Sequence, residues 1–236
     1  VYSKSNSRYL KSGSQIELHF TDTGPRDAPI LVLVHGYSAS LNTWDAWVRN
    51  LRKDYRVIRL DLPGHGLSRC VDNDEIGIEQ FIASIDRVTH SLDVDQFTLV
   101  GSSMGGHTAW AYALAHPDRL DGLVLVDAAG WLSAPGEDDK DPVIFKLLRN
   151  GFARNVMKDL DMSALIRSGL ENSFADPELV TDEMVERYSA MSRAPCHREA
   201  LLKIMSGTTL RVPASKERLS AIAVPTLILH GDTDNL

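Results

Sequence analysis

The sequence has few cysteines, no surplus of positive charge and no long apolar segment. Its 25 Lys and Arg residues against 32 Asp and Glu give a formal net charge of −7. The chain therefore lacks the basic surplus that neutralises phosphates, which excludes nucleic acid as a main partner. No apolar run approaches the length that crosses a membrane, so we expect no membrane span. The 236 residues show no internal repeat and no low-complexity tract, and they are enough for one large domain or a domain with an insertion.

The two cysteines, Cys70 and Cys196, lie far apart and form no spacing typical of a metal site. We expect two reduced thiols, no metal and no organic cofactor. The chain begins at Val1 rather than at a methionine. Two locations therefore stay open: the cytoplasm, which we favour slightly, and a secreted or membrane-anchored form that has lost an N-terminal segment.

Short apolar runs alternate with helical patterns over the first 130 residues. The segment 16–21 alternates apolar and polar residues as an edge strand does, whereas 30–34 is continuously apolar, as in a parallel strand covered on both faces. Further strands are expected over 56–60, 97–100 and 123–126, with helices over 44–51, 78–92 and 106–115. Strands that alternate with helices indicate an open, doubly wound parallel sheet.

The pattern changes after Trp131. Up to about Ser220 the apolar residues recur at helical spacing and no β-branched run appears. Strand character returns only over 224–229. We therefore predict an α/β core made of residues 1–130 and 221–236, with a helical insertion over 131–220 that forms a cap.

A Gly-Ser-Ser-Met-Gly stretch at 101–105 joins the strand expected over 97–100 to the Ala-rich helix expected over 106–115. Small residues at its two ends let strand and helix approach closely and push the middle serine above the sheet on a strained turn. Ser103 is therefore the candidate nucleophile, and Ser102 is a neighbour without chemistry. The alternative is a serine-glycine turn with no catalytic role, which this strand–turn–helix context disfavours.

Four motifs follow one another in order: His35-Gly36-Tyr37, an Asp-Leu-Pro-Gly-His-Gly-Leu-Ser run at 61–68, the serine motif at 101–106, and Gly231-Asp232-Thr233-Asp234. In this order and spacing the chain resembles the α/β-hydrolase family over essentially its whole length. The resemblance implies a mostly parallel, doubly wound sheet with a helical cap inserted after the sixth strand. It also implies a serine nucleophile, an acid after the seventh strand and a histidine after the eighth.

Further site residues follow from the chemistry of acyl transfer. The oxyanion of a tetrahedral intermediate needs fixed N–H donors, for which we expect the backbone N–H groups of Met104 and Tyr37. Asp234 is the favoured acid, which would orient the catalytic imidazole. Asp127, at the end of the sixth strand, is its main competitor, and its other interpretation is a turn or helix-cap residue.

The expected catalytic histidine is missing from the sequence. None of the eight histidines follows Asp234, and the chain stops at Leu236. The eight are His19, His35, His65, His90, His107, His116, His197 and His230. We interpret His35 and His65 as loop-stabilising, and disfavour every one of the eight as the base.

A chain that stops here would also leave an apolar parallel strand at the sheet edge. We therefore expect a C-terminally incomplete enzyme, a fragment or one piece of a cleaved chain, and very weak hydrolysis from these residues alone.

Within the resembling family, haloalkane dehalogenases and epoxide hydrolases have an aspartate where this chain has Ser103. The favoured function is therefore hydrolysis of a small carboxylic ester with an apolar acyl group, through an acyl-enzyme, as in esterases and lipases. Apolar residues that could line an acyl pocket, or simply pack the cap, are Trp131, Phe145, Phe152, Phe174, Tyr188 and Met191.

Two alternatives stay open. One is a carbon–carbon bond hydrolase of ring-cleavage products, in which Arg193 or Arg198 would bind the substrate carboxylate. The other is a ligand-binding protein that has the fold but has lost the catalytic triad.

Overall fold

The computed structural model describes residues 6–12, 16–70, 76–131, 160–206 and 213–232. Its strands are β1 (Ser7–Ser12), β2 (Ile16–Thr23), β3 (Ile30–Val34), β4 (Arg56–Leu60), β5 (Phe97–Ser102), β6 (Leu120–Val126) and β7 (Thr226–Leu229). They form one seven-stranded sheet in the order β1-β2-β4-β3-β5-β6-β7. From β4 to β7 all neighbours are parallel, which confirms the expected α/β-hydrolase fold.

The prediction of an edge strand over 16–21 is wrong. β2 is the second strand, because β1 pairs with it antiparallel, from Ser7 opposite Thr21 to Ser12 opposite Ile16. On its other side β2 pairs antiparallel with β4. The alternating pattern marks a strand but carries no information about which neighbours fill its two edges.

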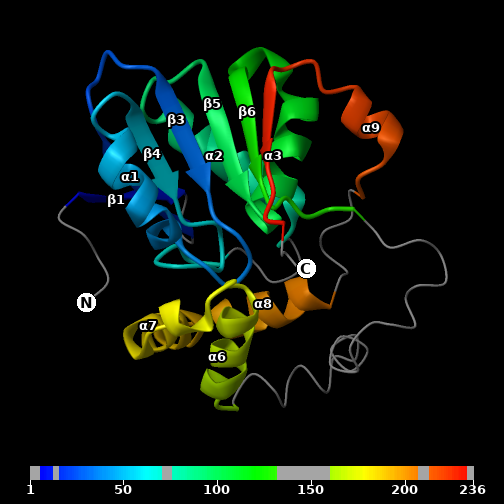
Figure 1. The fold of residues 1–236 in the computed structure, drawn as a ribbon. Coiled ribbons are helices and arrows are strands. Elements are labelled where there is room, and N and C mark those ends of the chain that lie inside the picture. Colours follow the sequence, from blue (N-terminus) through cyan, green and yellow to red (C-terminus); the bar gives the residue numbers. More distant parts are fainter. Residues whose placement is uncertain (1–5, 13–15, 71–75, 132–159, 207–212, 233–236) are drawn as a thin grey trace.

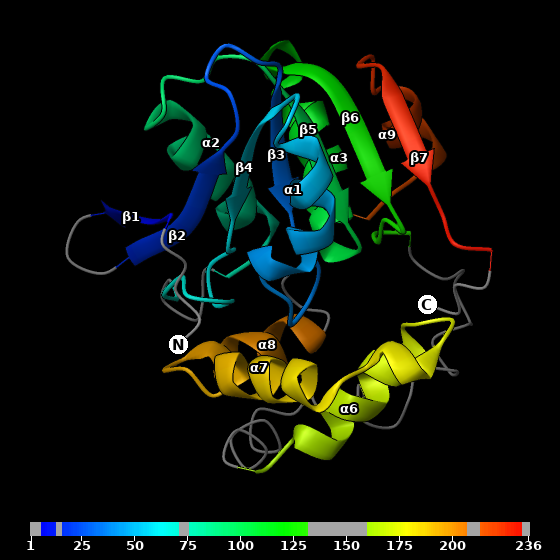
Figure 2. The ribbon, with the colours of Figure 1, turned by 60° about the vertical axis from the view of Figure 1, so that its left-hand side comes forward.

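Helices cover both faces of the sheet. They are η1 (Leu41–Trp44), α1 (Asp45–Leu51), α2 (Ile78–His90), α3 (Met104–Ala115), η2 (Pro117–Arg119), α6 (Ser163–Asn172), η4 (Pro177–Leu179), α7 (Asp182–Ser192), α8 (His197–Met205) and α9 (Lys216–Ser220). α1 lies on one face of the sheet, and α2 and α3 lie on the other (Figure 2). Among the described residues, no helix combines the length and apolarity needed to cross a membrane.

Helices α6, α7 and α8 gather beyond the ends of the strands to which the arrows of the parallel strands point (Figure 1). We call residues 160–206 the helical layer. It contains only helices and turns within its described range, as the apolar spacing predicts. The cap boundaries at 130/131 and 220/221 stay a prediction.

The core follows the apolar pattern of the sequence. On α2 the buried side chains include Ile78, Phe81 and Ile85, which recur at helical spacing and pack in the main core cluster. On the opposite face a smaller cluster includes Leu33 of β3 and Trp44 of η1. Full burial of one such side chain contributes about 1.5–3 kcal/mol, so the two clusters hold both helix layers on the sheet.

Strand β7 forms the second edge of the sheet and is strongly apolar. Its Leu227, Ile228 and Leu229 are 54%, 68% and 38% exposed. This arrangement agrees with the expected apolar edge strand after the helical region.

The expectation of two reduced thiols is wrong. Cys70 and Cys196 form a disulfide, although 126 residues separate them, and the structure has no free cysteine. Packing of α8 against the loop after β4 brings the two Cα atoms to 6.2 Å, within bonding range. Sequence spacing alone cannot show such a contact, because it depends on how the helical layer sits on the core.

The carboxylate of Asp61, just after β4, connects three parts of the core. It accepts hydrogen bonds from Leu41 N (2.6 Å) and Leu67 N (2.8 Å) and pairs with His19 Nδ1 (2.7 Å). A Cβ at Gly66 would lie only 2.1 Å from this carboxyl group, so the loop closes tightly around it. Although burial raises the pKa of Asp61, hydrogen bonding to His19 and the nearby imidazoles outweigh it and leave that pKa below its ordinary value.

We expect Asp61→Asn to lower the free energy of unfolding by about 2–4 kcal/mol. An amide places an NH₂ group against at least one backbone N–H that now donates to the carboxylate. Urea unfolding measures the change. Asp121→Asn, at an exposed position of β6, is the control and should change stability by less than about 0.5 kcal/mol. Equal effects of the two substitutions would contradict this role of Asp61.

Candidate active site

Ser103 lies between β5 and α3 with φ +50° and ψ −118°, a conformation that side-chain-bearing residues rarely adopt. Backbone hydrogen bonds hold it there. Its N–H donates to Val126 O, and its carbonyl accepts from Ala129 N and His107 N, each at 3.0 Å. The backbone on which the candidate nucleophile sits is therefore fixed from β6 and from the helix that follows.

The glycines around Ser103 are required by contact distances. A Cβ at Gly101 would lie 2.2 Å from Gly105 O, and a Cβ at Gly105 would lie 2.3 Å from Val34 O. Real Cβ atoms do not approach backbone this closely, so both positions exclude side chains. The close approach of strand and helix that the serine motif predicts is present.

The loop after β3 lies directly against this turn. A Cβ at Gly36 would be 3.1 Å from the Cβ of Ser103. His35 fixes the loop, since its Nδ1 lies 2.7 Å from Gly36 O and its Nε2 accepts from Leu62 N at 3.1 Å. Burial lowers the pKa of His35, and both ring nitrogens are engaged. The structure thus agrees with a loop-stabilising role for this histidine.

Tyr37 and Met104 flank the serine from two elements. Tyr37 follows Gly36 and is 37% exposed, but its hydroxyl reaches α8 and donates to Leu201 O at 3.1 Å. Burial of this hydroxyl end raises the pKa of Tyr37 above its ordinary value. Met104 is the first residue of α3 and is buried. Its N–H belongs to the first turn of the helix, where N–H groups have no partner within the helix.

Of the two candidate acids, Asp234 lies outside the described residues. Asp127 stands at the end of β6 with φ +44°. Its Oδ1 accepts from Gly231 N at 2.8 Å and lies 3.2 Å from His230 Nδ1. Asp127 therefore ties the end of β6 to the segment after β7. Sequence reasoning missed this pair, for which the only signal was that both residues follow parallel strands.

None of the histidines, all of which lie in the described part of the chain, forms a hydrogen bond with the Ser103 side chain. His107, one turn along α3, is buried and stacks on Trp110 with ring centroids 4.7 Å apart. His197 contacts two backbone carbonyls, Met191 O in the helical layer and Ser68 O in the loop after β4. These surroundings agree with the expectation that they are not the base.

His65 differs from the other loop histidine. Its Nδ1 lies 3.1 Å from Pro63 O, while its buried Nε2 has no partner within the described residues. It borders a small cavity between the loops of the core and the helical layer, which is also lined by Ser38, Met191 and Leu201. Burial, with a contribution from the His35 imidazole, lowers the pKa of His65 to about 3. At neutral pH its free nitrogen is therefore an acceptor only.

The side chains proposed for an acyl pocket differ in exposure. Met191 is buried, Tyr188 is half-buried, and Phe174 and Trp131 are exposed, whereas Phe145 and Phe152 lie outside the described residues. Arg198 is buried and donates to Leu160 O at 2.8 Å. Arg193 is exposed at the C-terminal end of α7.

Within the described residues, one group of metal-type donors lies together: Cys70, Cys196 and His197, with donor atoms within 4.8 Å of one another. Its two sulfurs are bonded to each other, and both imidazole nitrogens contact backbone carbonyls. In this state the group offers no open coordination site.

Comparison with known proteins agrees with this geometry. A family model of the alpha/beta hydrolase fold matches residues 29–236, and the chain belongs to this family. It is a hydrolase of the α/β fold. Over 231 residues it is 29% identical to a 2-hydroxy-6-oxononadienedioate/2-hydroxy-6-oxononatrienedioate hydrolase of Paraburkholderia phymatum, covering 95% of this chain and 77% of that protein.

Two solved structures share the fold. The epoxide hydrolase CorEH superposes with a TM-score of 0.82 at 19% identity, covering 96% of this chain and 82% of the other. A membrane phospholipase A, described as a bacterial virulence factor, gives a TM-score of 0.74 at 25% identity, covering 96% and 69%. At 19% identity, the similarity to the epoxide hydrolase shows only a shared fold.

We predict that stability falls as the pH drops from about 6.5 towards 4, partly because of His65. In the unfolded chain the His65 side chain binds a proton near pH 6.5. In the native protein the same side chain stays neutral down to about pH 3. The unfolded state thus binds more protons in this window, and His65 alone costs about 1.4 kcal/mol per pH unit. The lowered pKa values of His35 and His197 act in the same direction.

Urea unfolding at several pH values tests this. His65→Gln should give a visibly shallower loss of stability than the wild type between pH 6 and pH 4.5. His90→Gln, at an exposed position of α2, controls for the change of residue type. A slope left unchanged by His65→Gln would show that His65 is not neutral in the native state.

Proposed function

We propose that the protein is a serine-dependent hydrolase that cleaves a carbon–carbon bond in 2-hydroxy-6-oxo dienoic acids, the ring-cleavage products of aromatic compounds. The observation that carries this choice is the 29% identity, over 95% of the chain, to a relative named for such a substrate. Supporting it, Ser103 has the strained conformation and the glycine contacts that a nucleophile at this turn requires. The proposal replaces ester hydrolysis, which the sequence favoured, as the main function.

In this reaction the Ser103 hydroxyl attacks the ketone carbon and its proton passes to a base. The carbonyl oxygen becomes an oxyanion, which the N–H groups of Met104 and Tyr37 would stabilise. Collapse of the tetrahedral intermediate breaks the adjacent carbon–carbon bond. For its electron pair to be delocalised, the 2-hydroxy group must first become a ketone, with a proton added at C5. The pair then passes into the C2 ketone as a dienolate, which takes the proton held by the base, and water hydrolyses the acyl-enzyme to the second carboxylic acid and free Ser103. The same parts would serve an ester, with an alkoxide as the leaving group.

For the acid we retain Asp234. The carboxylate of Asp127 already accepts from Gly231 N and pairs with His230, so it is committed to holding the segment that leads to Asp234. An acid in the triad orients an imidazole and stabilises its charged form. None of the histidines is assigned as the base.

The helical layer, as the described part of the proposed cap, would supply the site for the substrate carboxylate. Arg198 is buried and its guanidinium donates to Leu160 O, which gives it a structural task. Arg193 is exposed two residues after Met191, which borders the cavity beside the loops of the core. Of the two arginines, Arg193 is therefore the better candidate for binding an anionic substrate.

Carboxylic ester hydrolysis is the second candidate. The likeness to a membrane phospholipase A, at 25% identity over 96% of this chain, favours it, since phospholipases A cleave esters. Because both reactions use a serine and an acyl-enzyme, only a comparison of substrates separates them.

The first test is a substrate panel on the full-length protein. We expect the dienoic diketone acid to be cleaved with a kcat/KM at least about 100-fold above those of short-chain and long-chain p-nitrophenyl esters, a difference of about 2.7 kcal/mol in transition-state stabilisation. Ser103→Ala should lower kcat by about 10³-fold or more and abolish the single fluorophosphonate adduct seen by intact mass. Ser102→Ala is the matched control and should keep both.

A higher kcat/KM on esters would favour the second candidate. An adduct that survives Ser103→Ala would remove Ser103 from the mechanism.

The second test concerns Arg193. Arg193→Ala should lower kcat/KM for the acid substrate by about 10–100-fold, because a charge-assisted hydrogen bond of about 1.5–3 kcal/mol is lost. Activity on an uncharged ester should change little. Arg49→Ala, at an exposed position of α1, controls for loss of positive charge. Equal losses on charged and uncharged substrates would mean that Arg193 does not bind the carboxylate.

A further inference from the structure

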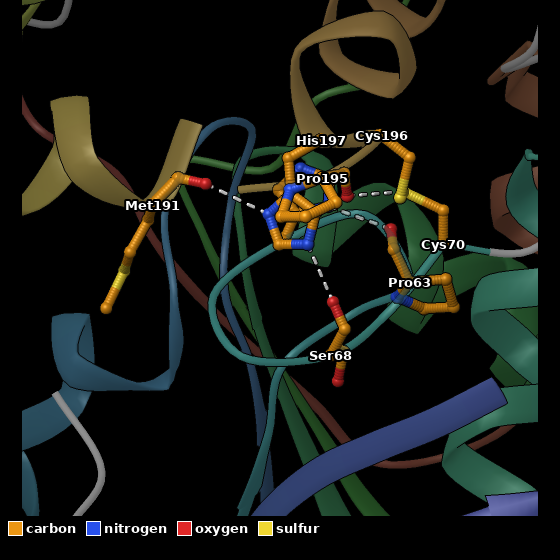
Figure 3. Close-up of a disulfide and its surroundings, with 8 residues drawn as sticks. Pro63, Ser68, Cys70, Met191, Pro195, Cys196 and His197 are labelled. Carbon is orange, nitrogen blue, oxygen red and sulfur yellow. Dashed lines mark hydrogen bonds between the residues drawn. A yellow bond between two sulfur atoms is a disulfide. The ribbon is translucent and has the colours of Figure 1, made fainter. Parts of the chain in front are cut away.

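The Cys70–Cys196 disulfide fastens the helical layer to the core beside the candidate active site. Cys70 follows the loop after β4, and Cys196 directly precedes α8 (Figure 3). Both residues are half-buried. The disulfide is a covalent link between the sheet-bearing part of the chain and the layer above it.

The imidazole of His197 makes a second, polar contact between the helical layer and the core, and it supplies fewer hydrogen bonds than its two short distances suggest. His197 Nδ1 lies 3.0 Å from Met191 O and its Nε2 lies 2.8 Å from Ser68 O (Figure 3). Both partners are carbonyl acceptors, and a neutral imidazole has one N–H. Burial lowers the pKa of His197, which keeps it neutral at ordinary pH. It therefore donates only one of these two bonds at a time. The disulfide is the covalent part of the link, beside the burial of Ala200 and Ile204 of α8 in the main core cluster.

Helix α8 rests on two loops of the core. A Cβ at Gly64 would lie 2.8 Å from the Cβ of Ala200, so helix and loop are in close contact there. At the next residue, Leu201 O accepts a hydrogen bond from the hydroxyl of Tyr37 at 3.1 Å. The loop that carries Tyr37 also touches Ser103 through Gly36. These contacts join α8 to the loop whose Tyr37 N–H is a candidate oxyanion donor.

We propose that Cys70–Cys196 is a thiol–disulfide exchange site that controls how firmly α8 holds the Tyr37 loop over Ser103. Its chemical partner is a dithiol reductant. The disulfide locks the start of α8 to the core, and reduction releases it, which loosens the helical layer and the loop together. This site does not depend on which bond the enzyme cleaves.

The exchange balances in two steps. A thiolate of the reductant attacks one Sγ, which forms a mixed disulfide and releases the other cysteine as a thiolate. The second thiol of the reductant then displaces the first cysteine. Two electrons and two protons pass to the protein, giving two cysteine thiols, while the dithiol becomes a disulfide.

Hydrogen exchange of the full-length protein, oxidised and after dithiothreitol, tests the proposal. EDTA is present throughout, so that the freed thiols and His197 take up no metal. We expect the amides of α8 to exchange at least about 10-fold faster after reduction, and those of the Tyr37 loop to become faster as well. The amides of α1, whose Val48 packs in the smaller core cluster on the other face of the sheet, should keep their rates. Reoxidation should restore the original pattern.

Cys70→Ser and Cys196→Ser should each reproduce the reduced pattern, and dithiothreitol should then have no further effect. Intact mass after alkylation provides the first check, since the wild type should take up two alkyl groups only after reduction. Alkylation without reductant, unchanged exchange in α8, or faster exchange in α1 to the same extent would each overturn the proposal. So would a loosened α8 beside an unchanged Tyr37 loop. These readouts need no substrate and stay interpretable if the proposed function fails.

Discussion

The structure depends first on the contact between β5 and α3 at Ser103. Strand and helix meet so closely that a single Cβ at Gly101 or Gly105 would collide with backbone. The positive φ of Ser103 costs free energy on the order of 1–3 kcal/mol. That cost is offset by hydrogen bonds from β6 and by burial of α3 against the sheet. The sheet, the helix and the turn must therefore form together, and the position of the serine between them is a consequence of their packing.

Two buried polar side chains, those of Asp61 and His35, fix the neighbouring loops by hydrogen bonds. Asp61 gathers three donors at the end of β4, and His35 links the loop after β3 to Leu62. Because Gly36 lies between His35 and Tyr37, these bonds also decide where the Tyr37 N–H stands relative to Ser103. The hydrogen bond from Tyr37 to Leu201 O of α8 connects these fixed loops to the helical layer.

What the sequence predicts well is what is local. The serine turn, the buried β3 and the apolar face of α2 each depend on residues within a few turns of one another, and each is found as expected. What it misses is long-range. The pairing of β1 with β2, the disulfide and the Asp127–His230 pair join residues whose contact is set by the packing of whole elements. For Asp234 the expectation goes beyond the described residues and stays a prediction.

The same division explains why the reaction is harder to infer than the fold. The turn at Ser103 is specified by backbone contacts. The fold around it is shared by an epoxide hydrolase with only 19% identity, at a TM-score of 0.82. Such a scaffold can host many chemistries, so structural likeness at this level says little about the substrate. In the proposed function, selectivity depends instead on side chains that the helical layer presents, and Arg193 is the one we propose. Sequence identity reports on such side chains more directly than the shape of the backbone does. For the proposed reaction, the relative with 29% identity over 95% of the chain is therefore a better guide than the epoxide hydrolase with 19%.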